Sequence, residues 1–251
     1  MIKYREHNLT KKRYAACIAI DLINSEKMLN QNENLTLLKR LINQLNEQYS
    51  GKVVVPFQIR GGDEVIGVVN SFAGGYHVAH DVWLFSLEKK MKVRIGIGFG
   101  KYDTLDTIDP NLINGSCVIS AFRARDKFLK LTKDNPYALT GPIQIYAYAN
   151  ELQIPFQAVN ALMYTMYELI KTEKQQKLVF ILQQYPDENY EQIAERLGYL
   201  KDSTSQNNRS TISKMLKRMK YKTFTQIKID IAHLLSSYQN LLDEEWKHND
   251  E

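Results

Sequence analysis

The sequence predicts a protein of the α+β class, with strands and helices in its N-terminal half and helices alone toward its C-terminus. Short apolar and β-branched runs alternate with helical periodicity as far as Gly100, and a glycine-rich turn joins two of these runs. Beyond Phe156 the apolar residues recur at helical spacing. A chain of 251 residues suits one large domain or two modest ones, and we favour two.

The N-terminal elements are expected in the order strand, helix, strand, strand, helix, strand. An apolar run that ends on Asp21 predicts a buried strand, and apolar residues at three- and four-residue steps predict a helix that ends at Gly51. Two β-branched runs then flank the turn 61–64, whose composition suits a tight hairpin. The expected elements lie at residues 13–21, 38–51, 53–60, 65–70, 73–90 and 93–99.

This βαββαβ order is that of a ferredoxin-like domain, in which right-handed crossovers leave the first strand beside the third. The end of the first strand and the turn between the second and third strands then lie at one edge of the sheet. We therefore expect Asp21 and Asp63 to be neighbours in space although they are far apart in the sequence.

The rest of the chain is expected to be helical, with a boundary in the looser stretch 132–142. The helices are predicted over residues 116–131, 156–184, 190–197, 211–221 and 224–242. The chain is thereby divided into an N-terminal domain, a set of connecting helices and a C-terminal helical domain, at residues 1–135, 136–188 and 189–251.

Composition and charge exclude several classes of protein. With 44% hydrophobic and 24% charged residues the chain can bury a core, and no apolar run approaches the roughly 20 residues that span a bilayer. Two cysteines without metal-ligand spacing, and an N-terminus without a signal-peptide core, predict a soluble cytoplasmic protein without structural zinc. His77 and His80 lie on an expected helix without a third ligand, so we expect them at the surface.

Asp21 and Asp63 predict a divalent metal site at the sheet edge. Two carboxylates held close together repel one another, and a divalent cation relieves that repulsion. Magnesium is the expected ion, with manganese as an alternative, because it is commonly held by one or two carboxylates plus substrate phosphates. Glu64 is a third candidate acid, and the backbone carbonyl of Leu22 or Ile23 is expected to complete the shell. In an enzyme, the catalytic roles would fall on the three acids.

The residues around these acids predict a phosphate-binding site for a nucleoside triphosphate. Backbone amides of the turn after the first strand are expected to point at phosphate oxygens, and glycines leave room for phosphate beside the hairpin backbone. Arginine and lysine side chains would supply counter-charges. The candidate phosphate ligands are Ile23, Asn24, Ser25, Arg60, Gly61, Gly62, Lys101, Arg123 and Arg125.

A purely structural interpretation is open for each feature taken singly. A Gly-Gly-Asp-Glu turn is commonly just a hairpin, and an acid after a strand commonly caps the next helix. Because the acid, the glycine-bearing turn and the strand order all have to coincide, their combination favours a binding site.

Three segments resemble blocks of the SatD-like family, at residues 18–25, 59–67 and 94–100. More distantly they are similar to the palm domains of class III nucleotide cyclases, GGDEF diguanylate cyclases and CRISPR-type polymerases. The resemblance implies a palm in which Asp21 and Asp63 bind the metals, with Glu64 at the second acidic position of the turn. Val65 stands where GGDEF enzymes have phenylalanine, and residues 114–117 replace an Asp-Gly-Pro-Ala block, which leaves catalysis open.

Segments 190–198 and 210–218 resemble the two helices of a helix-turn-helix, as in the SatD-like arrangement, although their connection is longer than usual. From Arg209 to Lys228 there are seven Lys or Arg and no acid, which favours contact with double-stranded DNA. The candidate DNA-binding residues are Arg209, Ser210, Thr211, Ser213, Lys214, Lys217 and Arg218. The alternative is a helical bundle with solvated lysines or a dimerisation module.

Together these features predict a regulator whose palm binds a nucleoside triphosphate or a cyclic nucleotide with magnesium, and whose helix-turn-helix binds DNA. The alternative is an enzyme that activates a ribose 3′-hydroxyl for attack on an α-phosphate with loss of pyrophosphate, making a signalling nucleotide. No membrane partner is expected, and the sequence leaves a homodimer open.

Overall fold

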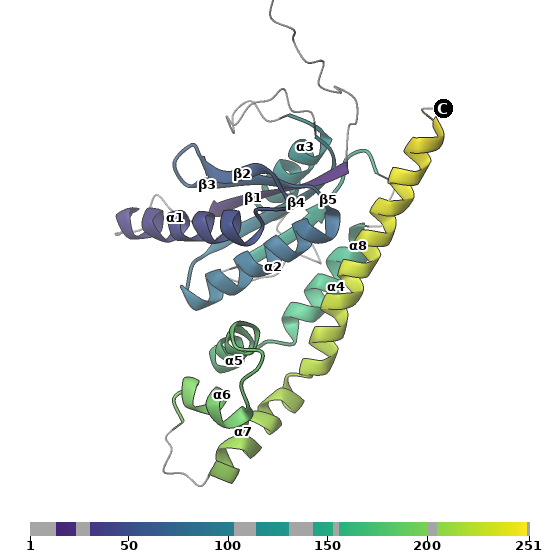
Figure 1. Ribbon diagram of the computed structural model, residues 1–251. Helices are drawn as coiled ribbons and strands as arrows, with labels where there is room; N and C mark the ends of the chain where they lie inside the picture. Colours follow the sequence, from purple (N-terminus) through teal and green to yellow (C-terminus); the bar gives the residue numbers. More distant parts are fainter. Residues whose placement is uncertain are drawn as a thin grey trace, which may run out of the picture.

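The computed structural model describes residues 14–23, 31–102, 114–130, 143–152, 156–199 and 205–249. Figure 1 shows a twisted sheet with helices on both faces and a group of helices that extends away from it. The last helix, α8, returns from the far end of this group and runs back past the sheet (Figure 1). The class is α+β, as predicted.

The sheet has the strand order β2-β3-β1-β4-β5. Its strands are β1 (Tyr14–Leu22), β2 (Val53–Arg60), β3 (Glu64–Val69), β4 (Val93–Lys101) and β5 (Ile143–Tyr148). The first four follow the expected ferredoxin-like order, with β1 between β3 and β4 and antiparallel to both. β5 lies parallel to β4 and covers an edge that would otherwise present unpaired backbone groups. The segment 136–188, for which only connecting helices were expected, therefore contains a strand of the sheet.

Two helices cover one face of the sheet, α1 (Gln31–Gln48) and α2 (Phe72–Glu88). Alternate residues of β1, such as Ala16 and Ile18, belong to the main core together with apolar residues of both helices. α2 is buried on nearly all sides because α5 and α8 pack against its outer surface. His80 is for this reason fully buried, and our expectation of a surface position for it was wrong.

The other face is covered by the short helix α3 (Ser116–Phe122) and the π-helix η2 (Arg123–Lys130). Gly96, Gly98 and Gly100 of β4 let α3 lie directly against the strand, because a side chain would collide with its backbone. A Cβ on Gly98 would lie 2.0 Å from the Cys117 carbonyl oxygen. This close approach brings the charged residues of η2 down onto the sheet.

The remaining helices of the described part are α4 (Phe156–Glu168), α5 (Glu173–Gln184), α6 (Tyr190–Arg196), α7 (Ser205–Arg218) and α8 (Tyr221–Asn249). The segment 156–184, for which the sequence left one helix or a pair of helices open, is a pair, since Thr172 and Gln175 form a capping box that begins α5. α7 begins earlier, and α8 ends later, than the apolar periodicity indicated. None of the described helices is long and apolar enough to cross a membrane.

α8 joins the C-terminal part of the described chain to the start of β1 and of α2. It packs beside α4 and across α2 (Figure 1). Its Gln239 side chain accepts a hydrogen bond from the Phe72 amide at 2.7 Å and donates to the Tyr14 carbonyl at 3.3 Å. Tyr238 stacks on Phe72 with 6.4 Å between the ring centroids. The C-terminal helix is therefore part of the structure that supports the sheet.

Candidate functional site

The end of β1 and the turn between β2 and β3 meet at one edge of the sheet, as the strand order predicted. In the register, Asp21 is paired with Glu64 of β3 on one side and with Arg94 of β4 on the other. Because alternate residues of a strand point to opposite faces, Asp21 lies on the face that α3 and η2 cover, away from the main core. Charged residues from three adjacent strands thus form a row beneath η2.

Three side chains of η2 complete an ionic cluster, which consists of Asp21, Glu64, Arg94, Arg125, Asp126 and Lys130. The Lys130 ammonium lies 3.0 Å from Asp21 Oδ2 and 3.3 Å from Asp126 Oδ1. Arg94 Nη1 lies 3.3 Å from the same Asp21 oxygen. Arg125 bridges the other two acids, with Nη2 2.9 Å from Glu64 Oε1 and Nε 2.8 Å from Asp126 Oδ1. Carboxylates and cations therefore alternate across the sheet edge.

Arg125 is the most buried member of the cluster, with 3% of its surface exposed. Burial alone would lower its pKa, but the hydrogen bond to Asp126 and the charges of Asp126 and Glu64 raise the pKa above its ordinary value. Burial alone would raise the pKa of Asp126, but Arg125 and Lys130 hold that pKa below its usual range. Both groups are charged at neutral pH. The Nη1 group of Arg125 is buried and has no hydrogen-bond partner within the described residues.

A pocket of about 500 Å³ opens beside the ionic cluster, lined by Arg60, Gly61, Asp63, Glu64, Phe122, Arg125 and Asp126. Gly61 and Gly62 have φ angles of 63° and 103°, which favour glycine, and no atom lies within 4 Å of an added Cβ. Their backbone is therefore open to a ligand. The guanidinium carbons of Arg60 and Arg125 lie 4.9 and 5.0 Å from the centroid of the Phe122 ring, so one aromatic ring positions two cations at the pocket.

A sequence model of the SatD family matches residues 14–235. The chain belongs to the SatD family. Matches among solved structures include the guanylyl cyclase domain of the RhoGC fusion protein from the aquatic fungus Blastocladiella emersonii, at 17% identity over 46% of this chain and 74% of that one, with a TM-score of 0.36. The catalytic core of a rhodopsin-guanylyl cyclase with converted specificity, in complex with ATPαS, matches at 17% identity over 46% and 72% of the two chains, with a TM-score of 0.34. No curated protein matches this SatD-family chain.

Most of the predicted metal-binding and nucleotide-binding residues of this SatD-family protein lie at the sheet edge. They are Asp21 with the neighbouring Leu22, and the pocket residues Arg60, Gly61, Asp63, Glu64 and Arg125 with Gly62 beside them. The Ile23 amide, predicted to bind phosphate, instead donates to the Lys92 carbonyl at 2.8 Å. Asn24 and Ser25 lie outside the described residues.

Two predicted counter-charges lie elsewhere. Lys101 is at the opposite end of β4 from Arg94, with its ammonium 5.5 Å from the Tyr14 ring centroid. Arg123 donates a hydrogen bond to Asn150, just after β5. Neither residue lines the pocket. The position of the expected helix over 116–131 depends on its contact with the glycines of β4, which the sequence alone does not indicate.

Sequence reasoning missed four residues at this site: Arg94, Phe122, Asp126 and Lys130. A signal was present for two of them, since Asp126 and Lys130 are four residues apart and face the same side of a helix. Their role became visible only from the position of η2 above Asp21.

At the position where a metal was predicted, Asp21 and Glu64 are paired with arginine and lysine side chains of the protein. Within the described residues, no three His, Cys, Asp or Glu side chains are grouped so as to hold a metal ion. Magnesium at Asp21 would take the place of the Lys130 ammonium, whose side chain is 34% exposed and can turn toward solvent. The cations of the cluster suit an anionic group directly, whereas a magnesium ion would have to share the Asp21 carboxylate with Arg94 after Lys130 moves away.

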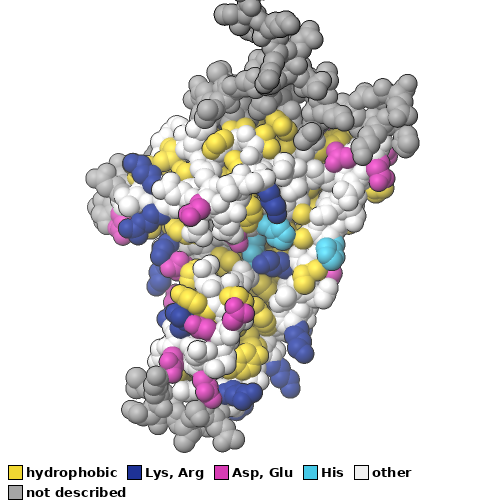
Figure 2. All heavy atoms as spheres, in the orientation of Figure 1, with side chains coloured by type: hydrophobic (Ala, Val, Ile, Leu, Met, Phe, Trp, Pro, Cys, Tyr) yellow, Lys and Arg dark blue, Asp and Glu magenta, His cyan; other side chains and the backbone are white. Residues whose placement is uncertain are grey.

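The predicted DNA-binding residues lie on or beside the outer side of α7. Ile193 of α6 and Ile212 of α7 are buried as the two helices pack together. On α7 the exposed residues are Arg209, Ser213, Lys214, Lys217 and Arg218, whereas Ser210 and Thr211 are half-buried. Figure 2 shows Lys and Arg side chains along the lower end of the molecule, where α7 and the start of α8 lie in Figure 1.

Proposed function

We propose that this SatD-family protein binds a nucleotide with magnesium in the pocket beside the ionic cluster, and that its C-terminal helices bind DNA in response. The observation that carries this proposal is the meeting of carboxylates, a buried guanidinium with an unpaired donor, and an open glycine turn at one sheet edge. A nucleotide–magnesium complex presents anionic oxygens and a cation together, and this edge offers partners for both.

The phosphate groups of the nucleotide would bind the cationic side of the pocket. Buried donors without partners are uncommon in proteins, and the Nη1 group of Arg125 can donate to a phosphate oxygen without leaving Glu64 or Asp126. The guanidinium of Arg60 lines the same pocket. The open backbone of Gly61 and Gly62 lets a phosphate approach without collision with a Cβ.

The carboxylates would hold the metal. Asp21, Asp63 and Glu64 offer the oxygen ligands that magnesium or manganese prefers, after Lys130 moves away from Asp21. When bound, the cation neutralises charge on the phosphates. Lys130 then loses one carboxylate partner but keeps Asp126, so the exchange leaves no charged group of η2 without a counter-charge.

The C-terminal part of the proposal is supported by the surface of α7. Its apolar side packs on α6, and its exposed side carries Arg209, Lys214, Lys217 and Arg218 with no acidic side chain between them. Phosphate contacts from such a helix give sequence-independent affinity, and the short polar side chains beside them can contact base edges. Because α8 continues from α7 to the sheet, the two proposed sites belong to one connected set of helices.

Substitution of the acids tests the nucleotide site. We expect Asp21→Asn and Asp63→Asn each to weaken magnesium-dependent binding of a nucleoside triphosphate at least about tenfold, because each removes ligand charge with little change in shape. Isothermal titration calorimetry with each of the common triphosphates measures the effect. Asp187→Asn, at an exposed position between α5 and α6, is the matched control and should bind as the parent does.

Unchanged binding in both Asp21→Asn and Asp63→Asn would contradict a metal site at this edge. The same samples distinguish a sensor from an enzyme. Binding without turnover supports the sensor, whereas release of pyrophosphate that stops in Asp21→Asn assigns the edge to nucleotidyl transfer.

A further inference from the structure

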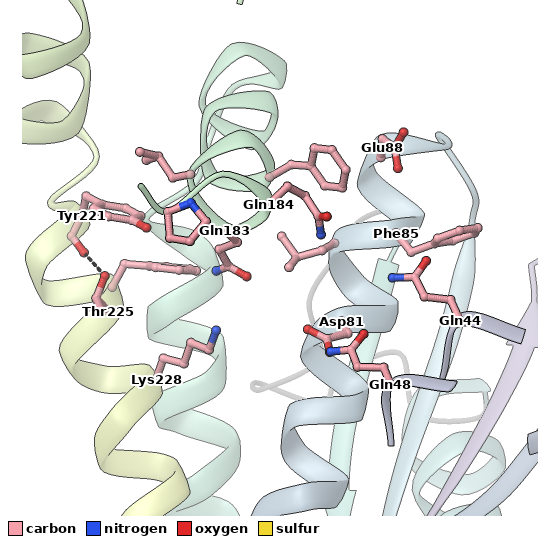
Figure 3. A pocket seen from close by; sticks show the side chains of 15 residues that line it. Gln44, Gln48, Asp81, Phe85, Glu88, Gln183, Gln184, Tyr221, Thr225 and Lys228 are labelled. Atoms are coloured by element: carbon pink, nitrogen blue, oxygen red, sulfur yellow. Dashed lines mark hydrogen bonds between the residues drawn. The ribbon is translucent and has the colours of Figure 1, made fainter. Parts of the chain in front are cut away.

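A second cavity, of about 600 Å³, lies on the opposite side of the sheet from the ionic cluster, between helices α1, α2, α5 and α8 (Figure 3). Its polar lining comes from several parts of the chain: Gln44 and Gln48 from α1, Asp81 from α2, Gln183 from α5 and Lys228 from α8. Its volume is within the range of small-molecule sites, roughly 300–1,000 Å³. The sequence predicted no binding site here, and Lys228 was noted only as the last residue of the basic run that begins at Arg209.

Of the three charged residues that line this cavity, Glu88 forms an ion pair with Lys89 at 2.6 Å, whereas Asp81 and Lys228 face the cavity without touching each other. Figure 3 shows Asp81 and Lys228 on facing helices, with open space between them. Both side chains are half-buried, and among the residues that the structure describes no carboxylate forms an ion pair with Lys228. Burial raises the pKa of Asp81 and lowers the pKa of Lys228, so each charge is costly in the absence of a partner.

Asp81 is held in place on the side that faces α1. Its Oδ2 atom accepts hydrogen bonds from the Tyr49 hydroxyl at 2.6 Å and from Gln48 Nε2 at 2.8 Å. Within the described part of the chain, the charge of Asp81 opposes the effect of burial on the pKa of Lys228, but the two side chains form no ion pair. The carboxylate therefore has a fixed position and can accept further hydrogen bonds from the cavity.

The amide groups of the cavity are positioned as well. Gln183 Nε2 lies 3.1 Å from His80 Nε2, and His80 Nδ1 lies 3.2 Å from the Tyr167 hydroxyl. Because His80 is fully buried, this chain fixes the Gln183 side chain at the cavity wall. Phe85 and Phe224 line the same cavity and supply apolar surface. The site combines fixed polar groups with apolar walls, which is typical of small-molecule sites.

We propose that this cavity binds a small zwitterion of the amino-acid class, with its carboxylate at Lys228 and its ammonium at Asp81. An anion alone would be attracted by Lys228 but repelled by Asp81. A cation alone would be attracted by Asp81 but repelled by Lys228. A ligand with both charges satisfies both groups at once and leaves the glutamine amides for its remaining polar atoms. This site does not depend on the nucleotide pocket.

A thermal-shift screen of the full chain against the standard amino acids, each at about 10 mM, tests this site, because a ligand of the folded state raises Tm. At least one amino acid should raise Tm, and calorimetry then gives its Kd. Analogues of that amino acid without the ammonium or without the carboxylate should bind at least about tenfold more weakly. Failure of every amino acid to raise Tm, or equal binding of an analogue with one charge, would overturn the proposal.

Substitutions locate the binding. Lys228→Met keeps the length and the apolar stem of the side chain and should weaken the amino acid at least about tenfold, as should Asp81→Asn. Lys222→Met, at an exposed position of the same helix, is the matched control and should bind as the parent does. If Asp81→Asn fails to fold because Tyr49 and Gln48 lose their acceptor, Lys228→Met and the analogues with one charge still test whether the amino acid binds in this cavity. Parental affinity in Lys228→Met would contradict the assignment.

Discussion

Two buried ionisable residues, Arg125 and His80, differ in how the fold accommodates their charge. Arg125 stays charged beneath η2 because Glu64 and Asp126 compensate for its loss of water, while its buried Nη1 group has no partner within the described residues. His80 shows the opposite solution, since it is fully buried and its ring nitrogens have only neutral partners. Arg125 thus keeps its charge because two carboxylates pair with it, whereas burial lowers the pKa of His80 and favours its neutral form.

His80 should make the protein less stable in mild acid. Burial holds its pKa well below the ordinary value, and burial lowers the pKa of His77 as well. As the pH falls through about 6.5, the unfolded chain takes up protons that the folded chain cannot, so stability present at higher pH is lost. Tm measured between about pH 8 and about pH 5 should fall, and His80→Gln should show a shallower fall. An unchanged slope in His80→Gln would contradict the assignment.

At the scale of elements, the contact between β4 and α3 decides where the candidate site lies. The glycines of β4 allow α3 to lie against the strand, and η2 continues from α3 over Asp21. Without this close approach, Arg125, Asp126 and Lys130 would lie too far from the sheet to form the ionic cluster.

Gly98→Ala should therefore destabilise the protein. The added Cβ would lie 2.0 Å from the Cys117 carbonyl oxygen and 2.1 Å from the Ala121 amide nitrogen, and both are backbone atoms that cannot rotate away. We expect a loss of roughly 1–3 kcal/mol or more in the free energy of unfolding, measured by urea denaturation. Gly51→Ala has nothing within 4 Å of the added carbon and should change stability by no more than about 0.5 kcal/mol. A loss in Gly98→Ala as small as that would refute the tight contact.

At the scale of the whole molecule, the C-terminal helices are integral to the sheet domain. Apolar residues from β1 through to α8 belong to one core, and Gln239 joins α8 to the start of β1 and of α2. A truncation before α6 would remove this support, so the DNA-binding proposal has to be tested with substitutions in the full chain.

Replacement of Lys214, Lys217 and Arg218 by glutamine should weaken duplex DNA binding regardless of sequence and flatten its salt dependence, because each phosphate contact releases condensed counterions. Binding is measured at several salt concentrations by fluorescence anisotropy. The matched control replaces Lys39, Arg40 and Lys52 by glutamine. These residues are exposed on α1 and just after it, and their replacement removes the same amount of charge. Equal loss of affinity in the two triple variants would mean that the basic side of α7 is only a solvated surface.

Much of the fold could be predicted because it follows from local patterns. Alternation and helical periodicity placed β1 to β4 and α2, and the strand order then put Asp21 beside the β2–β3 turn. β5 escaped prediction because a six-residue strand has little pattern of its own and depends on the open edge of β4. α2 is apolar on almost every side, which was a readable sign that His80 is buried.

The candidate site could be predicted only in part, for a related reason. Its acids and glycines come from a hairpin and a strand end, whose neighbours are set by strand order. The cations come from η2, whose position depends on a tertiary contact that no periodicity encodes. The pairing of Asp21 with Arg94 and Lys130, with which the proposed metal would have to compete, could be seen only in three dimensions.

The most direct test of a nucleotide–magnesium site at the sheet edge is the position of manganese in crystals grown with a nucleoside triphosphate. Manganese takes the place of magnesium and scatters anomalously, so its position can be measured independently of any assumed ligand. We predict an anomalous peak within bonding distance of the Asp21 carboxylate, with the Lys130 side chain turned away and phosphate density beside Arg125. A peak elsewhere, or bound nucleotide with Lys130 still paired to Asp21 and no peak there, would contradict the proposal.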